Sequence, residues 1–211
     1  NFSNLMLGKL RQIGKEKNLS SLMANGSVAF LGLLSFMLLT RQLNKELFGE
    51  WVLFITLATF VDLLRFGLTR TASVRQLSGA DALEKQRIMA SAFRINLVLL
   101  LLLTAFCWGL WLMITLSGQT INNGYFLFLT YYPWLAVANL GWNNAMSLFQ
   151  AEQNFNRMMW VRVLNVGLFC LFLVVNFLWL KEGILTVIWA NIIVNAISGV
   201  WCLLKGWDGL Y

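Results

Sequence analysis

Two oppositely charged side chains stand in the stretch VDLLRFGLTR, inside one of the most hydrophobic parts of the chain. Asp62 and Arg65 are three residues apart, so on a helix they share one face and can form an ion pair. The planar guanidinium of arginine donates hydrogen bonds in pairs, a geometry that suits phosphate. The stretch therefore predicts either a local ion pair, with Arg65 reaching to lipid headgroups, or a charged site that faces a water-filled cavity.

Polar side chains also recur at helical spacing in other apolar segments. The clearest series falls within an arc of about 80° on one helix face. Its members are Tyr132, Asn139, Asn143, Ser147 and Gln150. Further series are Asn191, Asn195, Ser198 and Cys202, then Ser21, Asn25, Gly32 and Ser35, and a thinner one of Arg162, Asn165 and Asn176. Such residues either join packed helices or line a polar interior, and together with Asp62 and Arg65 they favour a shared polar interior.

Catalytic and metal-binding patterns are absent from the sequence. The chain has no histidine, so no HExxH motif, and it has neither GxSxG nor a pair of carboxylates within an apolar segment. The three cysteines, Cys107, Cys170 and Cys202, lie in apolar runs without metal or disulfide spacing. We therefore expect no enzyme activity, no metal and no cofactor.

The elements that carry these residues are predicted to be membrane-spanning helices. The chain is 59% hydrophobic and 12% charged, whereas a soluble domain carries about 25% charged residues. Its mean hydropathy is +0.69. We expect an all-α, polytopic integral membrane protein with a six-helix transmembrane lobe over 20–204. At about 20 apolar residues a span, the spans are predicted at 20–40, 48–72, 90–116, 125–148, 159–180 and 184–204.

The second of these spans fixes the depth of the charged pair. The apolar run from Trp51 to Val61 is only 11 residues long, too short to cross about 30 Å of hydrocarbon at 1.5 Å per residue. The helix must therefore continue to about Ala72, which places Asp62 and Arg65 inside the membrane. Gly67 would let this helix bend, and Pro133 is expected to kink the fourth span. The third span has almost no polar face and is expected to lie against lipid.

The distribution of basic residues predicts the orientation. Twelve of the 16 lysines and arginines fall on one side of this map and three on the other, with Arg65 between them. The positive-inside rule then places both termini in the cytoplasm. Residues 1–19 are predicted to form a basic amphipathic segment on an anionic membrane face. Residues 205–211 are predicted to form a cytoplasmic tail or a linker to a missing second lobe. The net charge of the chain is +7, which could suggest a nucleic-acid partner. Because the basic residues are spread over the ends of the spans, we expect no nucleic acid as a partner.

Two segments resemble a known transporter family. The first, Leu38–Leu77, ends one span with an arginine, opens the next with Phe-Gly and closes it with Phe-Gly-Leu and a basic turn; the matching residues are Arg41, Leu43, Phe48, Gly49, Trp51, Phe66, Gly67, Leu68 and Arg70. The second is LFQAEQNFNRMMWVRVLNVG, a short Gln-rich turn that ends in an arginine. Both are similar to the N-terminal lobe of polysaccharide and O-antigen flippases, members of the multidrug/oligosaccharidyl-lipid/polysaccharide exporter superfamily. Asn44 stands where that family usually has glycine.

The resemblance implies a function, a location and partners. Family members have two such lobes around a cavity, so this chain corresponds to one lobe, and a missing C-terminal lobe or a second copy of the chain is expected. The sequence begins with Asn1, so we also expect its true start to be missing. The implied substrate is an undecaprenyl-diphosphate-linked oligosaccharide, turned from the cytoplasmic to the outer leaflet of a bacterial inner membrane. Arginine would bind the diphosphate, and side-chain amides would hydrogen-bond the glycan. The candidate substrate-binding residues are Arg65, Asp62, Arg41, Asn25, Asn139, Asn143, Gln150, Asn191 and Asn195.

Two other functions stay open at this stage. A drug exporter of the same superfamily would need acidic groups for cationic substrates, and Asp62, the one acid well inside a span, has an arginine beside it. A six-span scaffold subunit of a membrane complex is the stronger alternative, because one lobe alone cannot enclose a cavity.

Overall fold

The computed structural model describes residues 25–118 and 121–207, and within these ranges it contains helices and no strand. The elements are an N-terminal helix that ends at residue 42, α2 (Lys45–Leu77), α3 (Ala82–Ser117), α4 (Asn123–Ala151), α5 (Phe155–Val175), a π-helical turn η1 (Asn176–Leu180) and α6 (Ile184–Leu204). The all-α fold predicted from the sequence is confirmed. The expected basic segment 1–19 lies outside the described residues, as does most of the tail 205–211.

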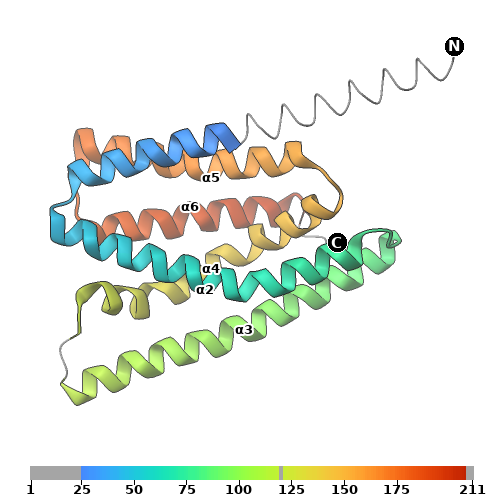
Figure 1. Cartoon of the computed structure of the whole chain (residues 1–211), viewed down its shortest axis with the longest axis horizontal. Helices are drawn as coiled ribbons and strands as arrows, with labels where there is room; N and C mark the ends of the chain where they lie inside the picture. Colours follow the sequence, from blue (N-terminus) through green and yellow to red (C-terminus); the bar gives the residue numbers. More distant parts are fainter. Residues whose placement is uncertain (1–24, 119–120, 208–211) are drawn as a thin grey trace, which may run out of the picture.

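Successive helices run in opposite directions and are joined by short turns (Figure 1). Asparagines begin three of them: the side chains of Asn44, Asn122 and Asn154 accept hydrogen bonds from the backbone N–H groups of Leu47, Gly124 and Arg157, as helix N-caps do. We call the end of the bundle where α2 meets α3 and α4 meets α5 the basic end, and the opposite end the Asn44 end.

Helix α4 is the centre of the bundle. It packs against α2, α3, α5 and α6, and Tyr132 and Ala136 of this helix are fully buried. Two glycines let α4 and α6 approach closely: a Cβ on Gly199 would lie 2.8 Å from the Ala138 carbonyl oxygen, and one on Gly141 would lie 2.9 Å from that of Gly199. Small residues at such positions allow backbone contact between membrane helices. Helix α4 continues through Pro133 as one element.

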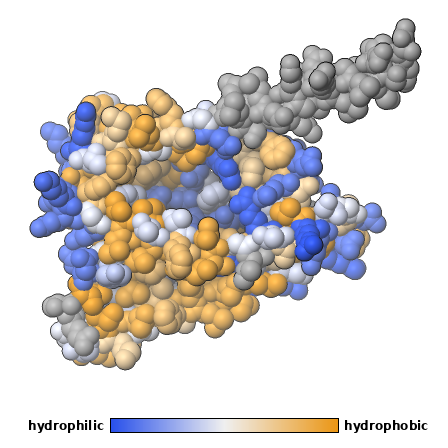
Figure 2. Space-filling model, viewed as in Figure 1, coloured by the Kyte–Doolittle hydropathy of each residue, from blue (hydrophilic) through white to orange (hydrophobic). Residues whose placement is uncertain are grey.

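The N-terminal helix and α5 lie side by side as a layer over the rest of the bundle (Figure 1). The Gln42 side chain donates a 2.6 Å hydrogen bond to the Leu173 carbonyl and ties the two helices together. At the Asn44 end the indole of Trp51 stacks on Phe169 and joins α2 to α5. Between the α5 layer and α2, Figure 2 shows a recess with hydrophilic surface in it.

Four helices in the described ranges are long and apolar enough to cross a membrane: α2, α3, the continuous α5 and η1, and α6. The outward face of α3 exposes a run of large apolar side chains, among them Leu97, Val98, Leu101, Leu102 and Phe106, and Figure 2 shows a broad hydrophobic surface. A surface of this kind is typical of a membrane-embedded protein. Helix α4 is not one of these four. The six-span count stays a prediction.

Candidate functional site

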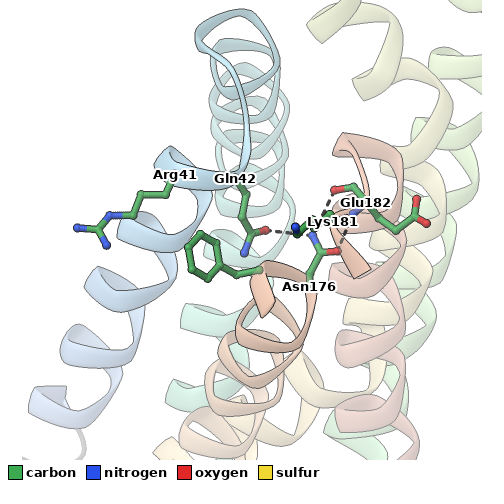
Figure 3. A pocket seen from close by; sticks show the side chains of 6 residues that line it. Arg41, Gln42, Asn176, Lys181 and Glu182 are labelled. Atoms are coloured by element: carbon green, nitrogen blue, oxygen red, sulfur yellow. Dashed lines mark hydrogen bonds between the residues drawn. The ribbon is translucent and has the colours of Figure 1, made fainter. Parts of the chain in front are cut away.

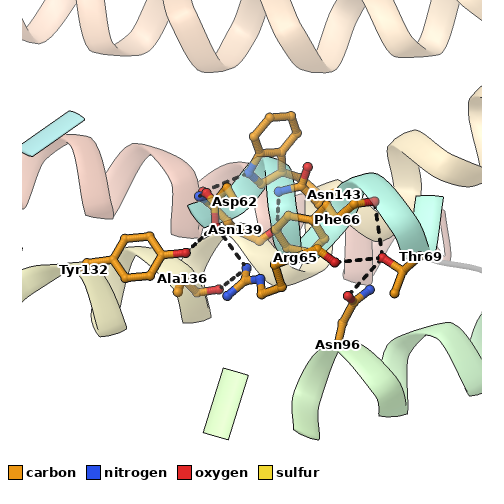
Figure 4. Close-up of polar contacts among 10 residues, drawn as sticks. Asp62, Arg65, Phe66, Thr69, Asn96, Tyr132, Ala136, Asn139 and Asn143 are labelled. Carbon is orange, nitrogen blue, oxygen red and sulfur yellow. Dashed lines mark hydrogen bonds and ion pairs between the residues drawn. The ribbon is translucent and has the colours of Figure 1, made fainter. Parts of the chain in front are cut away.

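Asp62 and Arg65 lie near the middle of α2, on one face of the helix (Figure 4). The Arg65 Nη2 atom lies 3.6 Å from Asp62 Oδ1, and the Arg65 side chain is 2% exposed. The guanidinium also lies over the Phe66 ring, with Cζ 4.1 Å from the ring centroid, a cation–π arrangement. The pair is therefore a buried ion pair on an apolar helix, and such pairs are costly unless their hydrogen bonds are completed.

Helix α4 completes the hydrogen bonds of Asp62. The Tyr132 hydroxyl donates to Asp62 Oδ1 at 2.7 Å, and the Asn139 amide donates to Oδ2 at 2.8 Å. Tyr132 and Asn139 are two turns apart on α4, so they reach the carboxylate from either side (Figure 4). The first part of the polar series predicted on this helix thus faces the charged pair.

Arg65 is less completely satisfied than its partner. Its Nη2 atom donates a 3.0 Å hydrogen bond to the Ala136 carbonyl of α4. Its Nε and Nη1 atoms are buried and have no hydrogen-bond partner among the described residues. An arginine has five N–H donors in a planar fork, so most of the donating capacity of this side chain is unused. The arrangement suits an additional acceptor, and phosphate oxygens match the fork.

The network continues toward the basic end on both sides of α2. Asn143 donates to the Asn139 carbonyl at 3.1 Å, and the Trp142 indole donates to the Asn139 side-chain oxygen at 3.2 Å. On the other side, the Thr69 hydroxyl lies 3.2 Å from the side-chain oxygen of Asn96 on α3. Figure 4 shows these groups gathered around Arg65. Polar side chains from α2, α3 and α4 therefore meet in one cluster, the Asp62–Arg65 network.

Arg65 is enclosed in this conformation. Arg65 is 5% exposed, Asn139 6% and Tyr132 0%, whereas the Asp62 side chain is 20% exposed. Four cavities at the two ends and on the outer face of the described bundle are lined by other residues. Two alternatives were predicted for the stretch VDLLRFGLTR: a local ion pair and a site that faces a cavity. The structure contains the ion pair, and α4 covers the Arg65 side chain, which therefore does not reach toward lipid headgroups. Helix α2 runs unbroken through Gly67, where a Cβ would meet nothing within 4 Å.

The amides of α6 belong to a separate cluster. The Asn195 side chain donates to the Asn191 carbonyl at 2.8 Å, and Asn165 of α5 donates to Asn195 Oδ1 at 3.2 Å and to the Ser198 hydroxyl at 3.0 Å. These bonds join α5 to α6, as polar residues between packed membrane helices do. Asn139 and Asn195 are buried, and Asn143 and Asn191 are half-buried. Asn139 and Asn143 are hydrogen-bonded to each other, and Asn191 and Asn195 likewise.

The remaining candidates lie away from Arg65. Gln150, near the basic end, accepts a 2.9 Å hydrogen bond from Arg70 Nε. Arg41 lines a cavity of about 270 Å³ at the Asn44 end with Gln42, Asn176, Phe177, Lys181 and Glu182. Its side chain points away from the bonds that Asn176 makes to Gln42 and to the backbone of Glu182 (Figure 3). Asn25 is exposed at the start of the described part of the N-terminal helix.

Four members of the Asp62–Arg65 network were not among the predicted site residues: Thr69, Asn96, Tyr132 and Trp142. Tyr132 belongs to the predicted polar series, and its spacing of seven from Asn139 was the available signal. Asn96 stands alone at the start of the apolar run LVLLLLL, and nothing in the sequence links it to α2. In the described ranges no group of three or more histidine, cysteine, aspartate or glutamate side chains could hold a metal ion.

Comparisons with family models, with curated proteins and with solved structures found no match to this chain.

Proposed function

We propose that this chain forms one lobe of a membrane transporter that turns a lipid-linked oligosaccharide from the cytoplasmic to the outer leaflet. The observation that carries the proposal is Arg65, a buried cation on an apolar helix with two guanidinium nitrogens unused by the described residues. Intramembrane charges are rare and mark ion or substrate pathways. The similarity of the segments Leu38–Leu77 and Leu148–Gly167 to polysaccharide flippases supplies the substrate class.

Arg65 would bind the diphosphate that joins lipid and glycan. Asp62 holds the guanidinium when no ligand is present and balances its charge, because the pair lies 3.6 Å apart. The half-buried amides of Asn143 and Asn191 are the kind of groups that hydrogen-bond sugar hydroxyls. The lipid chain would stay in the bilayer along the apolar faces.

Transport requires this network to open. The closed contacts described above put Arg65 beneath α4, so α2 and α4 must separate locally before a ligand reaches the guanidinium. A second lobe, or a second copy of the chain, would enclose the opened side. We place the basic end in the cytoplasm, in keeping with the bias of lysine and arginine toward that end.

The test is complementation of a strain that lacks its flippase. Arg65→Lys and Arg65→Ala are expected to abolish surface glycan while membrane levels of the protein stay near those of the wild type, because lysine keeps the charge but loses the paired donors. Asp62→Asn is expected to be milder. Arg75→Lys, an exposed position on the same helix, is the matched control and should complement fully.

Full export by the Arg65→Lys variant would refute the assignment of Arg65 to the diphosphate. The enclosed position of Arg65 itself favours one other function, a non-transporting scaffold subunit in which the ion pair fixes how α2 packs on α4. A scaffold would tolerate Arg65→Lys wherever the bundle stays folded, so the same variant separates the two functions.

A further inference from the structure

The cavity at the Asn44 end is bounded by charged side chains that take part in no ion pair. Its volume is about 270 Å³, which is room for about nine water molecules at about 30 Å³ each. Three of its lining residues are charged: Arg41 near the end of the N-terminal helix, and Lys181 and Glu182 between η1 and α6. All three are exposed, and the ion pairs in the described ranges are formed by other residues.

Hydrogen bonds between distant parts of the sequence fix the walls of this cavity. Asn176, which is fully buried, donates to the Gln42 side-chain oxygen at 3.0 Å and so connects η1 to the N-terminal helix. Its amide oxygen accepts from the Glu182 backbone N–H at 3.0 Å, and its nitrogen also donates to the Glu182 carbonyl at 3.3 Å. The backbone of Glu182 is therefore held close to Gln42, and the side chains of Arg41 and Glu182 stand on opposite sides of these bonds (Figure 3).

The backbone at Lys181 has a conformation that lysine seldom adopts. The π-helical turn η1 ends there with φ 53° and ψ 32°, in the left-handed region, where a helix ordinarily ends in glycine or asparagine. The Lys181 N–H closes the turn by donating to the Asn176 carbonyl at 2.8 Å. Both π-helical turns and non-glycine residues in this region are frequent at functional sites. Glycine would close the turn with less strain but would leave the cavity without this ammonium group.

The cavity lies where the apolar surface of the bundle gives way to charge. The apolar stretch of α5 and η1, which is long enough to cross a membrane, ends at Leu180, directly before Lys181. Leu178 and Trp179 in its last turn are 55% and 73% exposed, as side chains against lipid are, and tryptophan is enriched at the membrane surface. In a bilayer the cavity would therefore open at the level of the lipid headgroups.

We infer that Arg41, Lys181 and Glu182 bind the headgroup of a phosphatidylethanolamine-type lipid in this cavity. The two cations match the phosphate, to which the Arg41 guanidinium can donate paired hydrogen bonds, and the Glu182 carboxylate matches the ammonium group. A headgroup that carries the phosphate alone would leave the carboxylate as a repulsive neighbour. The acyl chains would stay outside the cavity, along Leu178 and Trp179. The inference does not rest on transport of a lipid-linked oligosaccharide.

The experiment counts the lipids that the purified full chain retains in native mass spectrometry, with phosphatidylethanolamine and phosphatidylglycerol titrated separately. The wild type is expected to bind phosphatidylethanolamine more tightly. Arg41→Gln and Lys181→Gln should each weaken this binding by about fivefold or more, because each removes a charged donor to the phosphate. Glu182→Gln should weaken binding of phosphatidylethanolamine by a similar factor and leave phosphatidylglycerol unchanged or tighter, because the carboxylate contacts only the ammonium group. Unchanged retention of phosphatidylglycerol also shows that this variant is folded.

Matched controls come from the same end of the bundle. Lys45→Gln and Glu46→Gln change exposed charges that line a different cavity, and both are expected to retain the two lipids as the wild type does. A calorimetric titration with phosphoethanolamine, which has no acyl chains, identifies the source of the headgroup: binding that is lost in the same variants assigns the site to a free solute as well, and no binding assigns it to lipid.

Three outcomes would overturn the site. They are equal losses in the control variants, a Glu182→Gln variant that binds phosphatidylethanolamine as the wild type does, and wild-type retention of neither lipid. All of these measurements are independent of transport, because a chain that fails in complementation can still retain the lipid here.

Discussion

Asp62 accepts hydrogen bonds from Tyr132 and Asn139, whereas Arg65 has one acceptor besides Asp62, the Ala136 carbonyl. The two members of the ion pair therefore depend on each other unequally. Without Arg65, the carboxylate keeps both of its donors. Without Asp62, the guanidinium is a buried cation with a single backbone acceptor, and an uncompensated buried charge is strongly destabilising.

This asymmetry predicts the effects of single substitutions on stability. Asp62→Ala should lower the free energy of unfolding by about 3–5 kcal/mol, and Arg65→Met should lower it by clearly less, because methionine fills part of the volume and leaves no unpaired cation. Equilibrium unfolding in mixed detergent micelles measures both. Arg75→Met, at an exposed site on the same helix, is the control, and an equal or larger loss for Arg65→Met than for Asp62→Ala would contradict the asymmetry.

At the scale of helices, α4 decides the arrangement of its neighbours. Its polar side chains face α2, and its glycine contact faces α6, so the helix is polar and small where it is enclosed. The outer helix α3 shows the opposite distribution, with large apolar residues outward and Asn96 inward. In lipid, packing between helices relies on close backbone approach and on hydrogen bonds rather than on burial of apolar surface.

The contact between Gly141 and Gly199 can be tested by adding one methyl group. Gly141→Ala and Gly199→Ala should each destabilise the protein by about 1–3 kcal/mol, because each Cβ would meet backbone atoms closer than 3 Å. Gly109→Ala on α3, where a Cβ meets nothing within 4 Å, should stabilise by up to about 1 kcal/mol. The same unfolding assay compares the three, and a stabilising alanine at position 199 would show that α4 and α6 are further apart.

At the scale of the whole molecule, lysines and arginines gather at one end of the bundle. The basic end carries eight of those in the described ranges, from Arg70 to Lys205, while Arg41, Lys45 and Lys181 lie at the other. Short turns join the helices at both ends, so the charge difference bears directly on orientation.

We therefore predict the topology of the chain in the membrane. Single cysteines at positions 85 and 156 should be protected from an impermeant thiol reagent in intact cells and react after lysis, whereas cysteines at 45, 122 and 181 should react in intact cells. The native Cys107, Cys170 and Cys202 are buried, which keeps their background low. Labelling of position 85 in intact cells would contradict the predicted orientation.

The sequence by itself determined most of the helices and the position of Asp62 and Arg65 within one of them, because hydropathy, capping asparagines and helix length are local properties; their depth in a membrane stays a prediction. It also determined that Asn139 and Asn143 share a face with Tyr132, since the helical period fixes that. The helices α2 and α3 extend beyond the spans predicted at 48–72 and 90–116, because a helix can continue past the apolar segment through polar residues.

Only the tertiary structure decided which polar faces meet. The series on α4 is hydrogen-bonded to α2 and the one on α6 to α5. That both series line one polar interior stays a prediction. The hydrogen bonds of Thr69 with Asn96 and of Arg70 with Gln150 join residues that are 27 and 80 positions apart. No spacing rule reaches across such separations, because which helices become neighbours depends on the packing of the whole bundle at once.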